Sequence, residues 1–179
     1  DYNFFRQFRK HLLLMFAKRV ILGASETRPS GWLATNKGLL DITEESDMAR
    51  VWRPGSRSAF LAEHVWEHLT EDQTRVANAN CFKYLKPGGY LRIAVPDGFH
   101  PDPLYIEQVR QNGTGLSARD HKMLYDYKTL KSALEDAGFK VNLLEYWDES
   151  GKFNYNAWSW EDGPITRSRD HDVRNKESP

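Results

Sequence analysis

The sequence predicts an α/β fold with a doubly wound, mostly parallel sheet, and two observations support this prediction. Short apolar runs of strand length alternate with helical segments along most of the 179 residues. Residues 82–97 contain the end of a helix, a Pro-Gly-Gly turn and an apolar run that stops at Pro96. Glycine supplies the left-handed backbone that ends a helix, and such a run is typical of a parallel strand covered on both faces.

The composition indicates a single globular chain in a reducing compartment. Hydrophobic residues make up 40% and aromatic residues 13%, which is enough for a core. The 25 basic and 25 acidic side chains cancel, so counterion release would contribute little and we expect no nucleic-acid partner. The single cysteine, Cys81, cannot form an internal disulfide, which favours a cytoplasmic location. No apolar run reaches the roughly 18 residues of a membrane span.

Residues 3–18 predict an amphipathic helix with a basic face. Its apolar stripe consists of Phe5, Phe8, Leu12 and Phe16. No acidic residue stands between Asp1 and Glu26. Such a helix can lie on a membrane surface, so peripheral membrane contact through residues 3–18 is one interpretation. The interpretation that we favour is that the stripe packs on the domain and the basic face is solvated.

The other elements follow from apolar runs and turn signals. We expect four short strands at residues 19–22, 32–35, 39–41 and 59–63. Thr70 and Gln73 form a capping-box signature that opens a helix over residues 71–85. The expected core stripe of this helix consists of Val76, Ala79, Phe82 and Leu85.

The second half of the chain predicts a helix and a hairpin. The helix runs from Tyr127 to Gly138, and a strand follows at residues 140–146. The sequence Asp-Glu-Ser-Gly at 148–151 is a good hairpin turn into a further strand at residues 152–158. We therefore divide the chain into an N-terminal helix (1–18), a main domain (19–160) and a polar, loosely held C-terminal segment (161–179).

Two motifs carry a resemblance to a known family. The LKPGG turn at residues 85–89, and the sequence AEHVWEHL at residues 62–69, resemble class I S-adenosylmethionine (SAM) dependent methyltransferases. A small, type 11-like branch also has a glycine loop that leads into a Pro-x-Gly-Trp strand, as at residues 29–32. The resemblance covers about residues 19–146. It implies a Rossmann-like methyltransferase fold, SAM as cofactor, and methyl transfer to a small molecule or another non-nucleic-acid acceptor.

The family's sheet also has an antiparallel last strand, for which the sequence offers no clear candidate. Residues after Trp160 are mostly polar or charged. Either residues 152–158 take that place, or the chain is a fragment that lacks the strand. We favour the fragment, because a hairpin partner would lie outside the preceding strand.

In this fold the ligand binds beyond the carboxyl ends of the strands. The cofactor-binding residues that the resemblance implies are Gly23, Ala24, Ser25, Asn36, Asp41, Ile42 and Glu63. Asn36 occupies the position at which the family has an acidic residue that accepts hydrogen bonds from the ribose hydroxyls. Asp41 occupies the position of the family's Asp that contacts the adenine amino group. An amide gives up the charge-assisted part of the ribose hydrogen bonds, so we expect weak SAM binding.

Histidines are the candidate catalytic residues. We expect His64, His100 and His121 to contact the acceptor, because an imidazole can take the proton of a hydroxyl or amine. The resemblance also places Trp66 in the substrate cleft. The fold would bring His68 to the same cleft as the other histidines. Loops of this length do not guarantee that two imidazoles share one centre, so we expect no metal.

Two other functions remain as alternatives. One is a catalytically inactive, methyltransferase-like binding protein. The other is a zinc hydrolase, since His64-x-x-Glu67-His68 matches the inverted zinc-peptidase signature. That signature requires a helix, whereas we expect a strand that ends near Glu63 and a helix that opens only at Thr70.

Overall fold

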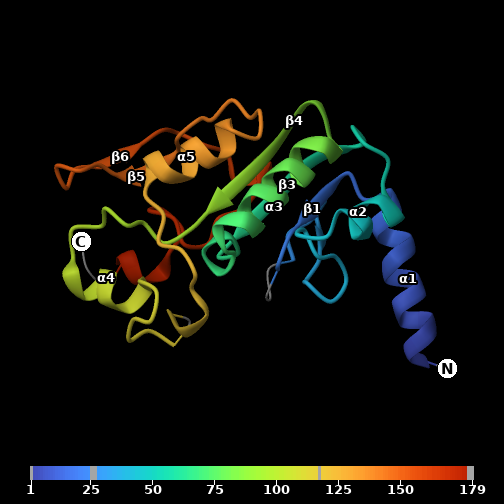
Figure 1. Ribbon diagram of the computed structural model, residues 1–179, viewed down its shortest axis with the longest axis horizontal. Coiled ribbons are helices and arrows are strands. Elements are labelled where there is room, and N and C mark those ends of the chain that lie inside the picture. The colour runs from blue at the N-terminus through green and yellow to red at the C-terminus, as the bar shows by residue number, and fades with distance from the viewer. Residues whose placement is uncertain (1, 25–27, 117, 177–179) are drawn as a thin grey trace. The chain divides into compact units, whose positions relative to one another are not determined.

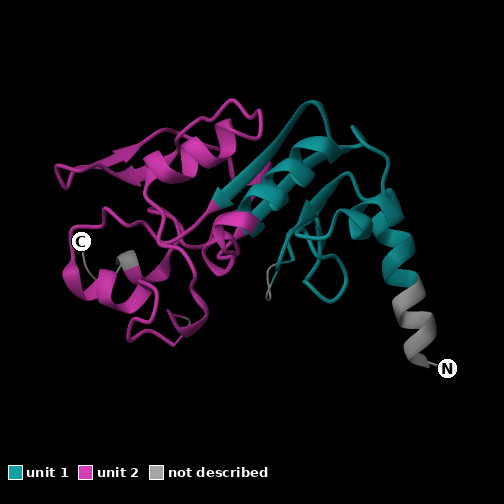
Figure 2. Cartoon of the chain, in the orientation of Figure 1, with its two compact units in different colours: residues 1–62, 73–93 teal, residues 63–72, 94–179 magenta. Residues whose placement is uncertain are grey.

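A computed structural model describes residues 2–24, 28–116 and 118–176. The chain forms two compact units (Figure 2). Unit 1 comprises residues 1–62 and 73–93, and unit 2 comprises residues 63–72 and 94–179.

Unit 1 is built on a four-stranded sheet in the order β2-β1-β3-β4 (Figure 1). Its strands are β1 (Arg19–Ile21), β2 (Leu33–Ala34), β3 (Arg57–Glu63) and β4 (Leu85–Ala94). The central strand β1 pairs in parallel with β2 and β3, and its Ile21 lies opposite Ala34 and Leu61. The predicted mostly parallel sheet is therefore confirmed.

Strand β4 lies alongside β3 over the whole length of β3. A Cβ atom on Gly89 would lie 3.0 Å from the carbonyl oxygen of Ser58, near the start of β3. Beyond the other end of β3, the backbone N–H of His64 donates to the carbonyl of Ala94 at 3.0 Å. The two strands therefore run in the same direction. Residues 89–94 are only half-buried, because β4 lies at the edge of the sheet.

Three helices accompany the sheet, namely α1 (Tyr2–Phe16), α2 (Glu45–Val51) and α3 (Glu71–Tyr84). The indole N–H of Trp52, just after α2, donates to the carbonyl of Leu14 at 2.7 Å. The Arg57 guanidinium donates to the carbonyls of Met15 and Ala17. These bonds satisfy carbonyl groups at the C-terminal end of α1, which have no partner within the helix.

Helix α1 does not bury its predicted stripe. Leu14 is buried, whereas the side chains of Leu12 and Phe16 are 45% and 72% exposed. Leu13 and Met15 are exposed as well. The prediction that the stripe packs on the domain is therefore wrong for Leu12 and Phe16, while Phe5 and Phe8 lie outside the described side chains. No helix in the described part of the chain is both long and apolar enough to cross a membrane.

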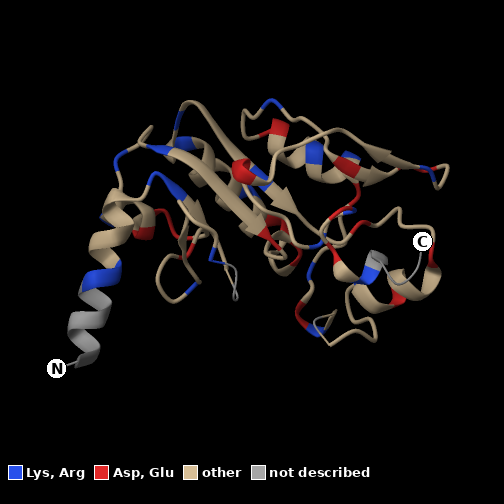
Figure 3. Ribbon diagram, turned by 180° about the vertical axis from the view of Figure 1, so that it is seen from behind, with Lys and Arg blue, Asp and Glu red and all other residues tan. Residues whose placement is uncertain are grey.

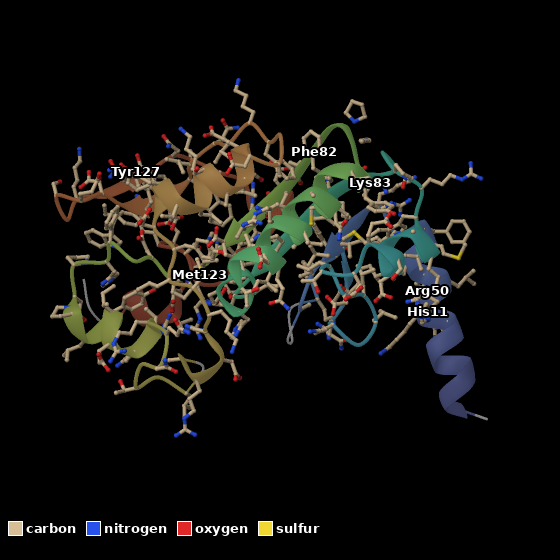
Figure 4. All side chains as sticks on the ribbon, viewed as in Figure 1. His11, Arg50, Phe82, Lys83, Met123 and Tyr127 are labelled. Atoms are coloured by element: carbon tan, nitrogen blue, oxygen red, sulfur yellow. The ribbon has the colours of Figure 1, made fainter. Side chains whose placement is uncertain are left out.

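Helix α3 begins and ends as predicted but buries a different face. Val76, Ala79 and Phe82 are exposed. Figure 4 labels Phe82 and the next residue, Lys83, near the end of α3. The buried side chains of this helix are those of Thr74, Ala77, Asn78, Asn80, Cys81 and Tyr84. The predicted stripe is therefore wrong, apart from the buried Leu85 beyond the helix end. Small and polar side chains occupy the true core face, and hydrophobicity alone does not identify them.

Unit 2 consists of short helices and one hairpin. Its elements are η1 (Trp66–His68), α4 (Pro103–Val109), η2 (Ala118–Asp120), α5 (Tyr127–Glu135), β5 (Glu145–Trp147), β6 (Phe153–Tyr155), η3 (Trp160–Asp162) and η4 (Val173–Lys176). The predicted hairpin is confirmed, since β5 and β6 pair antiparallel. Asp148 organises the turn by accepting hydrogen bonds from Ser150 and Lys152, and Gly151 has the left-handed φ of 77°.

Two predicted strands differ from the structure. Residues 39–41 form a turn, in which the N–H groups of Leu39 and Leu40 donate to the carbonyl of Asn36. Strand β5 pairs with β6 in a separate two-stranded sheet, so it does not extend the parallel sheet. Within the described ranges that sheet has four strands.

The C-terminal segment is packed rather than loosely held. Pro164, Ile165, Ser168 and Asp172 are buried. The hydroxyl of Ser168 donates to the carbonyl of Ile165 at 2.9 Å. Because most residues of this segment are polar, the sequence did not indicate that these few side chains are buried in unit 2.

Candidate functional site

The carboxyl ends of β1 and β2 lie side by side in unit 1. Past the paired residues, the N–H of Thr35 donates to the carbonyl of Ile21 at 2.8 Å, and the N–H of Ala24 donates to the carbonyl of Thr35 at 2.7 Å. Gly23 and Asn36 therefore leave neighbouring strands at the same edge. Both are exposed, and Gly23 has a φ of 65°. This edge therefore presents the exposed backbone of Gly23 and the exposed side chain of Asn36.

Asp41 follows one turn after Asn36 and is held as an acceptor. Its Oδ1 accepts hydrogen bonds from the N–H and the hydroxyl of Thr43 at 2.9 and 2.7 Å. The ammonium of Lys37 lies 3.4 Å from Oδ2. Partial burial raises the pKa of Asp41, but the Thr43 hydrogen bonds and the Lys37 charge outweigh it and lower the pKa below its ordinary value. The carboxylate is therefore ionised at neutral pH.

Two other predicted cofactor residues, Ile42 and Glu63, already have partners, and a third is not described. Ser25 lies outside the described residues. The side chain of Ile42 is buried, and its carbonyl accepts a hydrogen bond from the amide of Asn80 at 2.9 Å. In unit 2, both carboxylate oxygens of Glu63 accept from the Thr166 hydroxyl at 2.9 Å, and one also accepts from the Arg167 N–H at 2.6 Å. The Glu63 carboxylate thus already has partners in the C-terminal segment.

His64 is oriented by a buried carboxylate in unit 2. Its Nδ1 lies 2.9 Å from Oε1 of Glu67. Because a carboxylate accepts, Nδ1 carries the proton, and Nε2 of the neutral ring keeps its lone pair. The side chain of His64 is 44% exposed, whereas that of Glu67 is 1% exposed. A reachable imidazole backed by a carboxylate is the arrangement of an oriented general base.

His100 has different neighbours. Its ring lies 4.1 Å from the ring of Tyr105 and 5.3 Å from that of Trp147, measured between centroids. The N–H of Asp102 lies 3.2 Å from Nδ1, so this nitrogen accepts and its lone pair is engaged. Burial lowers the pKa of His100, although Asp102 and Asp97 oppose the shift. His100 is therefore less available as a base than His64.

The rings of His68 and His121 meet edge to face, with centroids 4.9 Å apart. One ligating atom from each of Glu67, His68 and His121 lies within 4.8 Å of the other two. The loops thus bring two imidazoles and a carboxylate together, a convergence that loops of such length do not guarantee. Trp66, predicted to line the substrate cleft, is instead fully buried.

The zinc-peptidase signature does not lie on a helix. Strand β3 ends at Glu63, a single 3₁₀ turn covers Trp66–His68, and α3 begins at Glu71. His64 has a φ of 57°, which is outside the helical range. The two histidines of the signature are therefore not related by one helical turn, as that type of zinc site requires.

Asp97 is a residue whose role the sequence did not indicate. Its Oδ2 accepts from the N–H of Trp147 at 2.7 Å, and its Oδ1 accepts from the N–H of Phe99 at 2.9 Å. Burial raises the pKa of Asp97, while these hydrogen bonds oppose the shift. Asp97 thus ties the loop after β4 to strand β5. Its partner lies far along the chain, so no local signal could have revealed it.

No protein-family model matches the sequence, and a search of curated proteins gives no significant match. Among solved structures, the chain is similar to a SAM dependent methyltransferase from Archaeoglobus fulgidus, with a TM-score of 0.53 and 18% sequence identity. The similarity covers 99% of this chain and 91% of that chain. It shows that this protein has the Rossmann-like fold of a SAM-dependent methyltransferase.

Proposed function

We propose that the protein is a SAM-dependent methyltransferase that acts on a small molecule or another non-nucleic-acid acceptor. The observation that carries this proposal is the parallel register of β1 and β2, which puts Gly23 and Asn36 at one edge of the sheet. Ligands of doubly wound folds bind at such an edge. A protein of similar fold is described as a SAM dependent methyltransferase, which supports the same conclusion.

The residues at this edge suit the cofactor in part. The exposed backbone of Gly23 would lie against the methionine part of SAM. Asn36 would accept one ribose hydrogen bond, and the ionised Asp41 would accept from the adenine amino group. Ala24, Ser25, Ile42 and Glu63 remain proposed members, although Ile42 is buried and Glu63 already has partners. When bound, SAM supplies an electrophilic methyl group.

The acceptor's proton would go to His64. Its Nε2 carries the lone pair, and Glu67 on the other ring nitrogen stabilises the imidazolium that forms. His100 and His121 are proposed to contact the acceptor. The balanced charge of the chain and its single cysteine support a non-nucleic-acid acceptor and a cytoplasmic location.

A second candidate is a methyltransferase-like protein that binds SAM but transfers no methyl group. It is favoured by Asn36, which stands where an acid is expected and cannot offer charge-assisted hydrogen bonds to the ribose. The two candidates differ only in turnover, so both binding and product must be measured.

The test is to incubate the chain with methyl-labelled SAM and a panel of hydroxyl and amine compounds, and to measure S-adenosylhomocysteine. We expect product with at least one acceptor, and a higher KM for SAM in Asp41→Asn. Asp136→Asn, which lies past the end of α5, is the matched control and should behave as wild type. Binding without product would favour the inactive candidate, and absence of SAM binding would overturn both.

We also propose that α1 contacts an anionic membrane surface. The described part of α1 exposes Leu12, Leu13, Met15 and Phe16. The described part of α1 also carries Arg9 and Lys10 and no acidic residue, and it is blue without red in Figure 3. An exposed apolar face beside positive charge favours the interface of an anionic bilayer.

A further inference from the structure

We propose that Glu67, His68 and His121 form a binding site for a divalent transition-metal ion, with Zn²⁺ as the best fit. Their ligating atoms lie within 4.8 Å of one another, close enough to converge on a single ion. All three residues belong to unit 2. The site is distinct from the zinc-peptidase signature, because it uses His121 in place of His64.

Both histidines make a backbone contact that favours the tautomer with the lone pair on Nε2. Nδ1 of His68 lies 3.3 Å from the carbonyl oxygen of Asp120, and Nδ1 of His121 lies 2.6 Å from that of Val109. A carbonyl only accepts, so each Nδ1 carries the proton and each Nε2 offers its lone pair. Histidines that ligate metals commonly donate their other N–H to a backbone carbonyl, which fixes the ring.

Glu67 has one buried carboxylate oxygen without a hydrogen-bond partner among the described residues. Its Oε1 is bonded to His64, whereas its buried Oε2 has no hydrogen-bond partner among the described residues. A buried carboxylate oxygen without a partner is destabilising. A cation held beside the two imidazoles would remove this cost. The unpartnered oxygen is therefore a second, independent observation that favours a cation at this place.

The backbone holds the three ligands in place. The carbonyl of Glu67 accepts hydrogen bonds from the N–H groups of Lys122 and Met123, at 2.7 and 3.1 Å. These bonds fix the segment that carries His121 against the turn that carries Glu67 and His68. His121 is nearly buried and His68 is half-exposed, so an ion can reach the site from the side of His68.

The ligand types indicate which metal binds. Two imidazoles and one carboxylate are typical of Zn²⁺ sites that keep a fourth position open for water or a substrate oxygen. Mg²⁺ and Ca²⁺ prefer oxygen ligands throughout, so they should bind far more weakly. This inference concerns metal binding alone and does not depend on the proposed methyl transfer.

The experiment uses the full chain without a polyhistidine tag, freed of metal by a chelator. Co²⁺ is added as a spectroscopic probe, and Zn²⁺ affinity is measured by competition with a chromophoric chelator. We expect one Zn²⁺ per chain and a higher Tm on adding Zn²⁺. His68→Asn and Glu67→Gln should each weaken Zn²⁺ binding more than tenfold, whereas the matched control His100→Asn should bind as wild type.

His64→Asn gives a second, independent measurement. Asparagine tolerates the left-handed backbone of this position, and the substitution removes the hydrogen bond that orients the Glu67 carboxylate. Loss of such an outer contact costs about 10- to 100-fold in metal affinity. The inference is overturned if the wild-type chain binds no Zn²⁺, or if Glu67→Gln and His68→Asn bind it as tightly as wild type. Because SAM is absent from these assays, their result does not depend on whether the protein is a methyltransferase.

Discussion

Nδ1 of the exposed His64 lies 2.9 Å from Oε1 of the buried Glu67, so the two residues form a hydrogen-bonded pair at the end of β3. The backbone of His64 is left-handed, with a φ of 57°, which costs a residue with a Cβ atom about 1–3 kcal/mol. Strain of this kind is common where the direction of a side chain serves a function. The pair joins a reachable base to a carboxylate that also belongs to the proposed metal site.

The first prediction concerns His64 as the base. His64→Asn should lower the rate of methyl transfer by about 10²- to 10⁴-fold, the usual contribution of a general base. The Kd for SAM should not change, because His64 is not among the proposed cofactor residues. Rates are measured at saturating Zn²⁺, so that weaker metal binding does not enter. His100→Asn is the comparison, and equal losses in both variants would contradict the assignment.

The second prediction concerns the ribose contact. Asn36→Asp should tighten SAM binding by up to about tenfold, the order expected from one charge-assisted hydrogen bond. Calorimetry measures the Kd of both proteins directly. An unchanged or weaker affinity in Asn36→Asp would remove this residue from the ribose site.

The third prediction concerns stability in acid. Hydrogen bonds from Arg174 lower the pKa of Asp172 to about 2, from an ordinary value of 3.8. Because the folded-state pKa is the lower one, this stabilisation is complete above pH 3.8 and is lost as the pH falls towards 2.

Asp172→Asn should therefore lower the free energy of unfolding at pH 7 by about 1–2 kcal/mol, and by much less at pH 2. Urea unfolding at both pH values measures the difference. The exposed Asp170→Asn is the control. The same loss at both pH values would show that the ion pair is not its cause.

The fourth prediction concerns α1 and membranes. The double variant Leu12→Ser and Phe16→Ser should bind vesicles that contain anionic lipid at least tenfold more weakly, because two apolar side chains no longer enter the interface. Wild-type binding should also fall as salt is raised. The control is Leu104→Ser, because this leucine on α4 is as exposed as Phe16. Cosedimentation that does not distinguish the double variant from wild type would exclude this surface.

Local signals predicted the elements whose ends are marked in the sequence. The helix start near Thr70 and the hairpin at residues 148–151 were correct, because capping residues and turn glycines act over a few positions. The prediction of the core face of α3 was wrong, because the buried Ala77 and Cys81 are small, whereas the large Phe82 is exposed. Packing against the sheet, rather than hydrophobicity, decides which face is buried.

The candidate sites also contain residues that local signals predicted and residues that only long-range contacts bring together. Gly23 and Asn36 were found because each follows a strand, and the parallel pairing then places them at one edge. The convergence of His121 on Glu67 depends on hydrogen bonds between the Glu67 carbonyl and residues 122 and 123. The sequence predicted that the fold would bring the histidines to one cleft. Contacts so far apart in the sequence leave no local pattern, however, that shows which histidines meet.

The central claim is that the edge formed by β1 and β2 binds SAM. Isothermal titration of the full chain with SAM tests it most directly, with a Gly23→Val variant in parallel, because a branched side chain at this left-handed position would obstruct the backbone. We expect one SAM per chain with micromolar or weaker affinity, and a clear loss of affinity in Gly23→Val. Absence of binding by the wild-type chain at millimolar SAM, or equal binding by a folded Gly23→Val variant, would contradict the claim.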